Sequence, residues 1–155
     1  MAKLISTNPS NNYKRLGEVE VSSEKEILKK VKNARTAQLT WGSMELNKRI
    51  NLLKSIVPLF TDRKEELSKL ISHEMGMPIS QAALDIDMGI DYLNWYLDNA
   101  EVCLKPETTL ETEKEIHKVI YEPKGVVASI VPWNFPFSNF IWQVGQNLIV
   151  GNTIV

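Results

Sequence analysis

The sequence contains a single cysteine, Cys103, so no internal disulfide can form and the thiol is compatible with a reducing compartment. The first residues lack the apolar core of a signal peptide, and no apolar run reaches the length that crosses a bilayer. Together these absences favour a cytoplasmic protein with no membrane partner.

The chain also lacks a surplus of positive charge, because 18 basic residues face 19 acidic ones and leave a formal net charge of −1. A nucleic-acid-binding surface needs lysines and arginines that neutralise phosphates, so this balance argues against such a partner. The lysines that cluster between positions 25 and 32 lie beside glutamates, which is typical of a solvated helix face.

Motifs for metals and for nucleotide phosphates are missing as well. His73-Glu74 begins like a zinc-binding helix motif, but Met77 occupies the place of the second histidine. His117 has no cysteine or histidine close to it in the sequence. We therefore expect no metal site in these residues. Neither common glycine-rich phosphate loop is present either.

Apolar residues at helical spacing dominate the first two thirds of the chain. Ser23-x-x-Glu26 predicts a capping box for a first helix, and Asp62-x-x-Glu65 predicts the cap of a third. The predicted helices run from Ser23 to Trp41, from about Glu45 with an interruption at Pro58, from Asp62 to Met75, and from Pro78 to Pro106.

The periodicity then changes to that of strands. Residues 114–121 and 126–131 are predicted to pair as a hairpin across the turn at 122–125. Residues 136–150 follow as a helix that Gly151 ends, and the chain then begins another strand. We therefore predict an α/β fold with helices first, then a hairpin, then the first strand–helix–strand unit of a parallel sheet that is incomplete within these residues.

The connection after residues 126–131 holds the candidate site. Pro132 and Pro136 bias the residues before them toward extended conformations, so the chain between them is stiff. Asn134 lies there, beyond the carboxyl end of a strand, where open α/β sheets bind ligands. Its amide offers two N–H donors that do not titrate and that can stabilise an oxyanion. Alternatively, Asn134 caps the helix that starts near Pro136.

Three stretches resemble the aldehyde dehydrogenase superfamily in their order and spacing. They are Glu122-Pro123-x-Gly125-Val126-Val127, Ile130-x-Pro132-Trp133-Asn134-Phe135-Pro136 and Gly151-Asn152-Thr153-Ile154-Val155. The helical region is similar too, through Leu70-Ile71-x-x-Glu74-x-Gly76-x-Pro78 and the helix around Tyr92 to Asn99. The resemblance implies three parts: an extended segment and helices of the cofactor-binding domain (1–113), a hairpin for oligomerisation or entry into the sheet (114–131), and the incomplete start of a Rossmann-like cofactor-binding core (132–155).

The resemblance also implies roles for particular residues. Asn134 is expected to donate its amide to the oxyanion that forms when a cysteine thiolate attacks an aldehyde, which is then oxidised to a carboxylic acid. The other implied positions are Ile130, Val131, Pro132 and Trp133 against NAD or NADP, and Phe135 and Trp142 as aromatic walls of the substrate channel.

In this family the nucleophilic cysteine, the general-base glutamate and the cofactor-binding lysine follow the stretch that matches here, so we expect residues 1–155 alone to be inactive. Cys103 falls on the apolar side of the last long helix and is expected to be a buried packing thiol. Trp41 and Trp95 are expected in the core.

The chain departs from the family pattern at Met77, at Gln143, and at Gly145-Gln146-Asn147. The last of these places polar side chains on a packed helix.

The stretch from Asn94 to Glu107 resembles the succinate-semialdehyde dehydrogenase branch, whose substrate carboxylate needs a cation. No cationic residue occurs between Phe137 and Trp142, so succinate semialdehyde is weakly favoured and a neutral aliphatic aldehyde stays open as the substrate. A different hypothesis is a non-catalytic remnant or binding module of a split gene, whose hairpin adds a strand to a partner's sheet. Under either hypothesis we expect a homo-oligomer or association through the hairpin.

Overall fold

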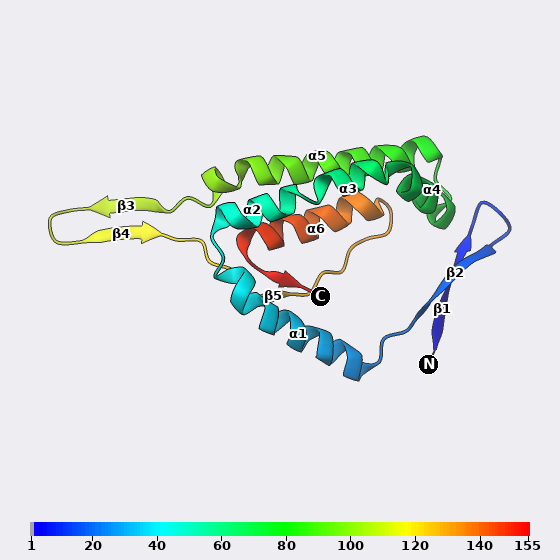
Figure 1. Cartoon of the computed structure of the whole chain (residues 1–155), viewed down its shortest axis with the longest axis horizontal. Helices are drawn as coiled ribbons and strands as arrows, with labels where there is room; N and C mark the ends of the chain where they lie inside the picture. Colours follow the sequence, from blue (N-terminus) through cyan, green and yellow to red (C-terminus); the bar gives the residue numbers. More distant parts are fainter. Residues whose placement is uncertain (1) are drawn as a thin grey trace.

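The computed structural model describes residues 2–155 (Figure 1). The helices are α1 (Glu24–Gly42), α2 (Leu46–Lys54), α3 (Val57–Asp62), α4 (Lys64–Met75), α5 (Ile79–Cys103) and α6 (Pro136–Val150). The strands are β1 (Lys3–Asn8), β2 (Lys14–Glu20), β3 (Glu107–Glu111), β4 (Ile116–Val119), β5 (Val126–Val127) and β6 (Thr153–Ile154). The α/β class and the closing strand–helix–strand order agree with the sequence prediction.

The core forms where α5 lies along α6, with α2, α3 and α4 packed against α5 (Figure 1). Most of its buried apolar side chains come from these two long helices: Ala82, Ile86, Leu93, Leu97 and Ala100 on α5, and Phe137, Ile141 and Ile149 on α6. Burial of such side chains is the main favourable contribution to the folded state. Among residues 2–155, no helix is both long and apolar enough to cross a membrane.

The β5–β6 pair lies between two helices, with α6 on one side and α1 on the other (Figure 1). Trp41 on α1 is half-buried and donates its Nε1–H to the Leu148 carbonyl at 2.8 Å. Thr153 on β6 donates its hydroxyl to the Ala34 carbonyl at 2.9 Å. These hydrogen bonds join α1 to the end of the chain across more than a hundred residues.

The start of α1 follows the sequence prediction. The Ser23 hydroxyl accepts from the Glu26 backbone N–H at 3.3 Å, and the Ser23 N–H donates to the Glu26 carboxylate at 2.7 Å, which together form the capping box. Hydrogen bonds from Ser23 lower the pKa of Glu26, because they favour its charged form.

The predicted cap of the third helix at Asp62 is wrong. Asp62 is the last residue of α3, and α4 begins at Lys64 after Arg63. The chain stays nearly helical through this junction, so Asp62 has no free first turn to cap, and Arg63 pairs instead with Glu66 at 2.8 Å. Pro58 lies in the first turn of α3, where a missing N–H breaks no helical hydrogen bond.

The pairing of the strands also differs from the prediction. Residues 114–121 do not pair with 126–131; instead β4 pairs with β3 in an antiparallel hairpin, and β5 pairs in parallel with β6. The hairpin turn is at Thr112, whose hydroxyl accepts from the N–H groups of Lys114 and Glu115 at 3.2 and 3.1 Å. The segment 122–125 is a crossover in which Gly125 donates to the Asn152 side chain at 2.8 Å.

The last turn of α6 is held by a buried arginine on α2 that the sequence analysis missed. Arg49 Nε donates to the Ile149 carbonyl at 2.9 Å and its Nη2 to the Val150 carbonyl at 3.4 Å, while Nη1 bonds the Met44 carbonyl. Burial lowers the pKa of the Arg49 guanidinium. Gly151 ends α6 as predicted, at a φ of +107°, and a Cβ there would lie 3.4 Å from the guanidinium carbon.

We predict that Arg49→Met lowers the free energy of unfolding by about 2–3 kcal/mol, because buried carbonyls lose a charged donor. Lys48→Met removes an equal charge from an exposed position of α2 and should change that free energy by less than about 0.5 kcal/mol. Urea unfolding of both variants measures the difference. Equal losses in the two variants would show that the Arg49 contacts do not stabilise the fold.

Candidate functional site

The candidate site lies in the connection between β5 and α6. The parallel pairing continues past β5, because the Val155 N–H donates to the Val127 carbonyl at 2.9 Å and the Ser129 N–H to the Val155 carbonyl at 2.8 Å. The chain leaves the sheet after Ser129 and reaches α6 at Pro136. Residues 130–135 therefore stand at the carboxyl end of a parallel strand, which is the position that the sequence analysis expected.

Asn134 is exposed in this connection and does not cap α6. The N-cap residue is Phe135, and no side chain at the cap position donates or accepts a hydrogen bond there. The Asn134 Oδ1 accepts from the Asn139 side-chain amide at 3.4 Å, and the same Asn139 amide reaches the Pro132 carbonyl at 3.4 Å. The capping alternative for Asn134 is thus wrong, and its own amide N–H groups donate to no other residue of 2–155.

The four positions expected to line a nicotinamide cofactor form an open surface. Ile130 is 94% exposed and Trp133 is 76% exposed, while Val131 is half-buried. Val131 and Trp133 also line an apolar cleft between this connection and α4, of about 460 Å³. These residues therefore present an open apolar surface at the end of the strand.

The two expected channel aromatics are both partly exposed. Phe135 immediately precedes α6, and Trp142 lies within the helix, seven residues later. Their exposures are 40% and 44%, and the Trp142 ring lies 5.2 Å from that of Tyr92 on α5. Both aromatic side chains are therefore partly open to solvent, Phe135 directly after Asn134 and Trp142 about two turns along α6.

Asp85 is the residue at this site that the sequence analysis missed. It lies in the second turn of α5 and is 0% exposed. Its two carboxylate oxygens accept from the N–H groups of Phe137 and Ser138 at 3.0 Å each, and Oδ1 also accepts from the Ser138 hydroxyl at 2.5 Å. The sequence held one signal: an acidic residue directly before Ile86, among the apolar positions of a core helix.

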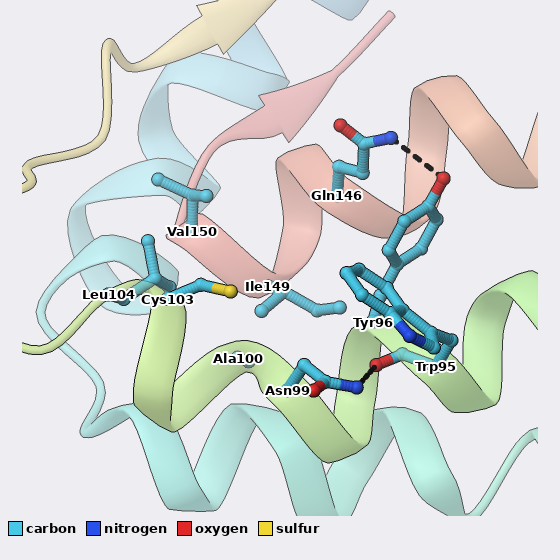
Figure 2. A pocket seen from close by; sticks show the side chains of 9 residues that line it. All are labelled: Trp95, Tyr96, Asn99, Ala100, Cys103, Leu104, Gln146, Ile149 and Val150. Carbon is cyan, nitrogen blue, oxygen red and sulfur yellow. Dashed lines mark hydrogen bonds between the residues drawn. The ribbon is translucent and has the colours of Figure 1, made fainter.

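Cys103 is exposed, so the expectation of a buried packing thiol is wrong. It is the last residue of α5 and lies at the edge of an open pocket of about 220 Å³ beside Ile149 and Val150 on α6 (Figure 2). Trp95 lines the same pocket and is 58% exposed, so it is not a core residue either. Helical periodicity gave the correct side of α5, but α6 covers only part of that side.

The polar stretch of α6 packs without leaving its polar groups unpaired. Gln146 donates to the Tyr96 hydroxyl at 2.9 Å (Figure 2), and the Asn147 side-chain oxygen accepts from Asn152 at 3.1 Å. Gly145 is buried, and a Cβ there would lie 3.3 Å from Leu93, so its small size allows α5 and α6 to approach closely. Within residues 2–155, no buried side-chain nitrogen or oxygen lacks a hydrogen-bond partner.

Comparison with known proteins agrees with this arrangement. The model of the aldehyde dehydrogenase family matches residues 2–155, and the chain belongs to that family. A 1-pyrroline-5-carboxylate dehydrogenase of Staphylococcus epidermidis is 29% identical over 97% of this chain, and a succinate-semialdehyde dehydrogenase [NADP(+)] of Deinococcus radiodurans is 30% identical over 84% of it. These matches cover 29% and 27% of the two relatives, respectively.

The fold is likewise that of the amino-terminal part of solved aldehyde dehydrogenases. An NADP-dependent glyceraldehyde-3-phosphate dehydrogenase from Bacillus halodurans, solved with NADP, superposes with a TM-score of 0.91 and 28% identity. The superposition covers 99% of this chain and 33% of that one. The chain thus spans about a third of the length of the proteins that it matches.

We predict that Asn134→Ala changes the free energy of unfolding by less than about 0.5 kcal/mol, because an exposed residue that caps nothing contributes little. Ser138→Ala, four residues after Asn134, should cost about 1.5–3 kcal/mol, since it removes a buried hydrogen bond to the Asp85 carboxylate. Thermal or urea unfolding of the two variants gives the comparison. A larger loss for Asn134→Ala than for Ser138→Ala would mean that Asn134 supports the helix after all.

Proposed function

We propose that residues 2–155 supply the oxyanion-stabilising amide and one wall of the cofactor site of an NAD- or NADP-dependent dehydrogenase that oxidises an aldehyde to a carboxylic acid. The observation that carries this proposal is the state of Asn134. Its amide is exposed at the carboxyl end of a parallel strand, plays no part in capping α6, and lies within a chain that matches the aldehyde dehydrogenase family throughout.

The proposed chemistry begins when a cysteine thiolate attacks the aldehyde carbon. A sulfur–carbon bond forms, the carbonyl π electrons move to oxygen, and an oxyanion appears where a neutral oxygen stood. The Asn134 amide donates an N–H to that oxygen and stabilises the charge without a proton transfer. A fixed neutral donor of this kind is worth about 10²–10³ in rate.

The nucleophile is not Cys103. Cys103 faces the last turn of α6, whereas Asn134 precedes its first turn. A helix of 15 residues at about 1.5 Å per residue separates the two by roughly 20 Å. The thiolate and the base that this chemistry needs therefore belong to protein outside residues 2–155, and we propose that these residues alone do not oxidise aldehydes.

The cofactor wall comprises Ile130, Val131, Pro132 and Trp133, which leave the sheet directly before Asn134. NAD or NADP, when bound there, would take up the electrons released as the aldehyde carbon is oxidised. The open apolar surface of Ile130 and Trp133 would exclude water from one side of the ring. The solved dehydrogenase from Bacillus halodurans contains NADP, which supports a nicotinamide cofactor without selecting between the two.

The substrate is proposed to be a small aldehyde that passes Phe135 and Trp142. The relatives are named for two different substrates, 1-pyrroline-5-carboxylate and succinate semialdehyde, and both of these carry a carboxylate. Between Phe137 and Trp142 this chain has no cation that would bind such a group. A carboxylate-bearing substrate would need its cation from another part of the enzyme, whereas a neutral aliphatic aldehyde needs none.

In an active aldehyde dehydrogenase that contains this chain, Asn134→Ala should lower kcat by about 10²–10³, with a smaller change in the cofactor KM. Asn134→Asp should be slower still, because a carboxylate repels the oxyanion. Steady-state kinetics with saturating cofactor measure both variants, with Gln143→Glu, at an exposed position later on α6, as a control for added charge. An Asn134→Asp enzyme that works at nearly the native rate would contradict the proposal.

A second proposal concerns association, and it stands whether or not the chain is part of a catalyst. Every residue of β3 and β4 is exposed, and the hairpin projects away from the helices (Figure 1). Ile116, Ile120 and Tyr121 present apolar surface on it and beyond it, at exposures of 54%, 62% and 47%. An unpaired edge with apolar side chains adds readily to a second sheet.

We therefore expect the 155-residue chain to form dimers or larger species in light scattering at micromolar concentrations. Ile116→Lys should shift the distribution toward monomer, because it places a charge on the exposed hairpin. Leu39→Lys makes the same change on helix α1, away from any strand edge and at a position that is 71% exposed, and should have no such effect. A monodisperse monomer for the unaltered chain would show that this edge does not associate.

A further inference from the structure

We infer that Asp85 is a positioning residue that fixes the Asn134 amide through the first turn of α6, an inference that rests on the role proposed for Asn134 above. The hydrogen bonds of Asp85 go to Phe137 and Ser138 and reach neither the connection 130–135 nor any group that would react. It acts from inside the protein, on the backbone of the helix that begins two residues after Asn134.

The first turn of α6 depends on an outside acceptor. A helix leaves its first N–H groups without a partner, and a side chain at the N-cap usually satisfies one of them. Here the N-cap is Phe135, which has no side-chain acceptor, and Pro136 has no N–H. The first two available donors are those of Phe137 and Ser138, and both donate to the Asp85 carboxylate at 3.0 Å.

A carboxylate suits this place for two reasons. The amino-terminal end of a helix carries partial positive charge, which stabilises an anion held against it. A fully buried carboxylate is costly unless hydrogen bonds compensate it, and Asp85 receives three, the third from the Ser138 hydroxyl at 2.5 Å. The site is therefore built for an anion and would be poorly satisfied by a neutral amide.

The same helical turn reaches Asn134. Asn139, directly after Ser138, places its side-chain amide 3.4 Å from the Pro132 carbonyl and 3.4 Å from the Asn134 Oδ1. Asn139 thus holds the oxygen side of the Asn134 amide, and the Asn134 N–H groups donate to no other residue of 2–155. A continuous chain of contacts thus runs from the Asp85 carboxylate through Ser138 and Asn139 to the orientation of the Asn134 donor.

A separate contact should keep α6 in place when Asp85 is changed. The orientation of the Asn134 amide can therefore be tested apart from folding. The Phe137 ring packs edge-on against Phe60 with centroids 5.1 Å apart, and it fills the space beside Gly89, where a Cβ would lie 2.5 Å from the ring. Asp85→Asn keeps the size of the side chain and this packing, but it turns one acceptor into a donor that faces a backbone N–H. The first turn then loosens while the helix remains.

The 155-residue chain provides the direct test. In Asp85→Asn, the ¹⁵N order parameter of the Asn134 side-chain amide should fall relative to the unaltered chain, with the backbone of 133–138 falling below about 0.6 from about 0.85. Asp91→Asn, an exposed carboxylate later on α5, should leave both unchanged. Ser138→Ala loses one of the three hydrogen bonds and should lower these order parameters by less. It replaces Asp85→Asn in the test if Asp85→Asn does not fold. Order parameters unchanged in both variants would overturn the inference.

Kinetics in an active aldehyde dehydrogenase that contains this chain separate positioning from mere stability. Asp85→Asn should lower kcat by about 10–100-fold, with the cofactor KM within about twofold, as expected when a catalytic group shifts slightly. In the Asn134→Ala background, Asp85→Asn should lower kcat by less than about threefold, because the amide that Asp85 positions is absent. Equal losses in both backgrounds would overturn the positioning role. No loss from Asn134→Ala alone would instead overturn the proposed function, while the order parameters still decide how Asp85 acts.

Discussion

The first turn of α6 donates three hydrogen bonds to the buried Asp85 carboxylate, and its last turn gives two carbonyls to the buried Arg49 guanidinium. The two charges match the partial charges at the two ends of a helix, positive at the start and negative at the end. Asp85 belongs to α5 and Arg49 to α2, so α6 is fixed to two different helices. Its position along and around its own axis is thereby set.

The placement of the candidate site follows from that constraint. The connection 130–135 leaves the sheet at Ser129 and meets α6 at Pro136, so a fixed α6 fixes both of its ends. Asn134 lies in this connection with its amide oxygen facing Asn139. Gly151 ends α6, and β6, which pairs with β5, begins two residues later. The end of α6 therefore positions β6 beside β5, and its start positions Asn134.

The features that the sequence analysis predicted correctly are those that neighbouring residues determine. The capping box at Ser23, the left-handed Gly151 and the stripe of α5 each depend on residues within a few positions of one another. Strand pairing failed because the partner of β5 is 27 residues away, and the turn at 122–125 resembles a hairpin turn locally. Nothing in that local pattern indicates which strand lies alongside.

The two buried charges were missed for a related reason. Asp85 and Arg49 bond to backbone groups that lie 52 and 100 residues away, and a backbone group leaves no mark in the sequence. The error at Cys103 is different in kind. Periodicity showed which side of α5 it occupies, but the depth of cover there depends on where α6 ends. The site residues themselves came from family resemblance, since spacing alone left the capping alternative for Asn134 open.

The position of the candidate site depends on the anchoring of the first turn of α6, and native-state hydrogen exchange along that helix measures this anchoring most directly. First-turn amides of an ordinary helix have no partner within the helix and exchange quickly. If Asp85 holds this turn, the amides of Phe137 and Ser138 should exchange as slowly as those of Ile141 and Gly145 in the middle of the helix. Exchange at Phe137 and Ser138 as fast as in the exposed connection before them would contradict the account.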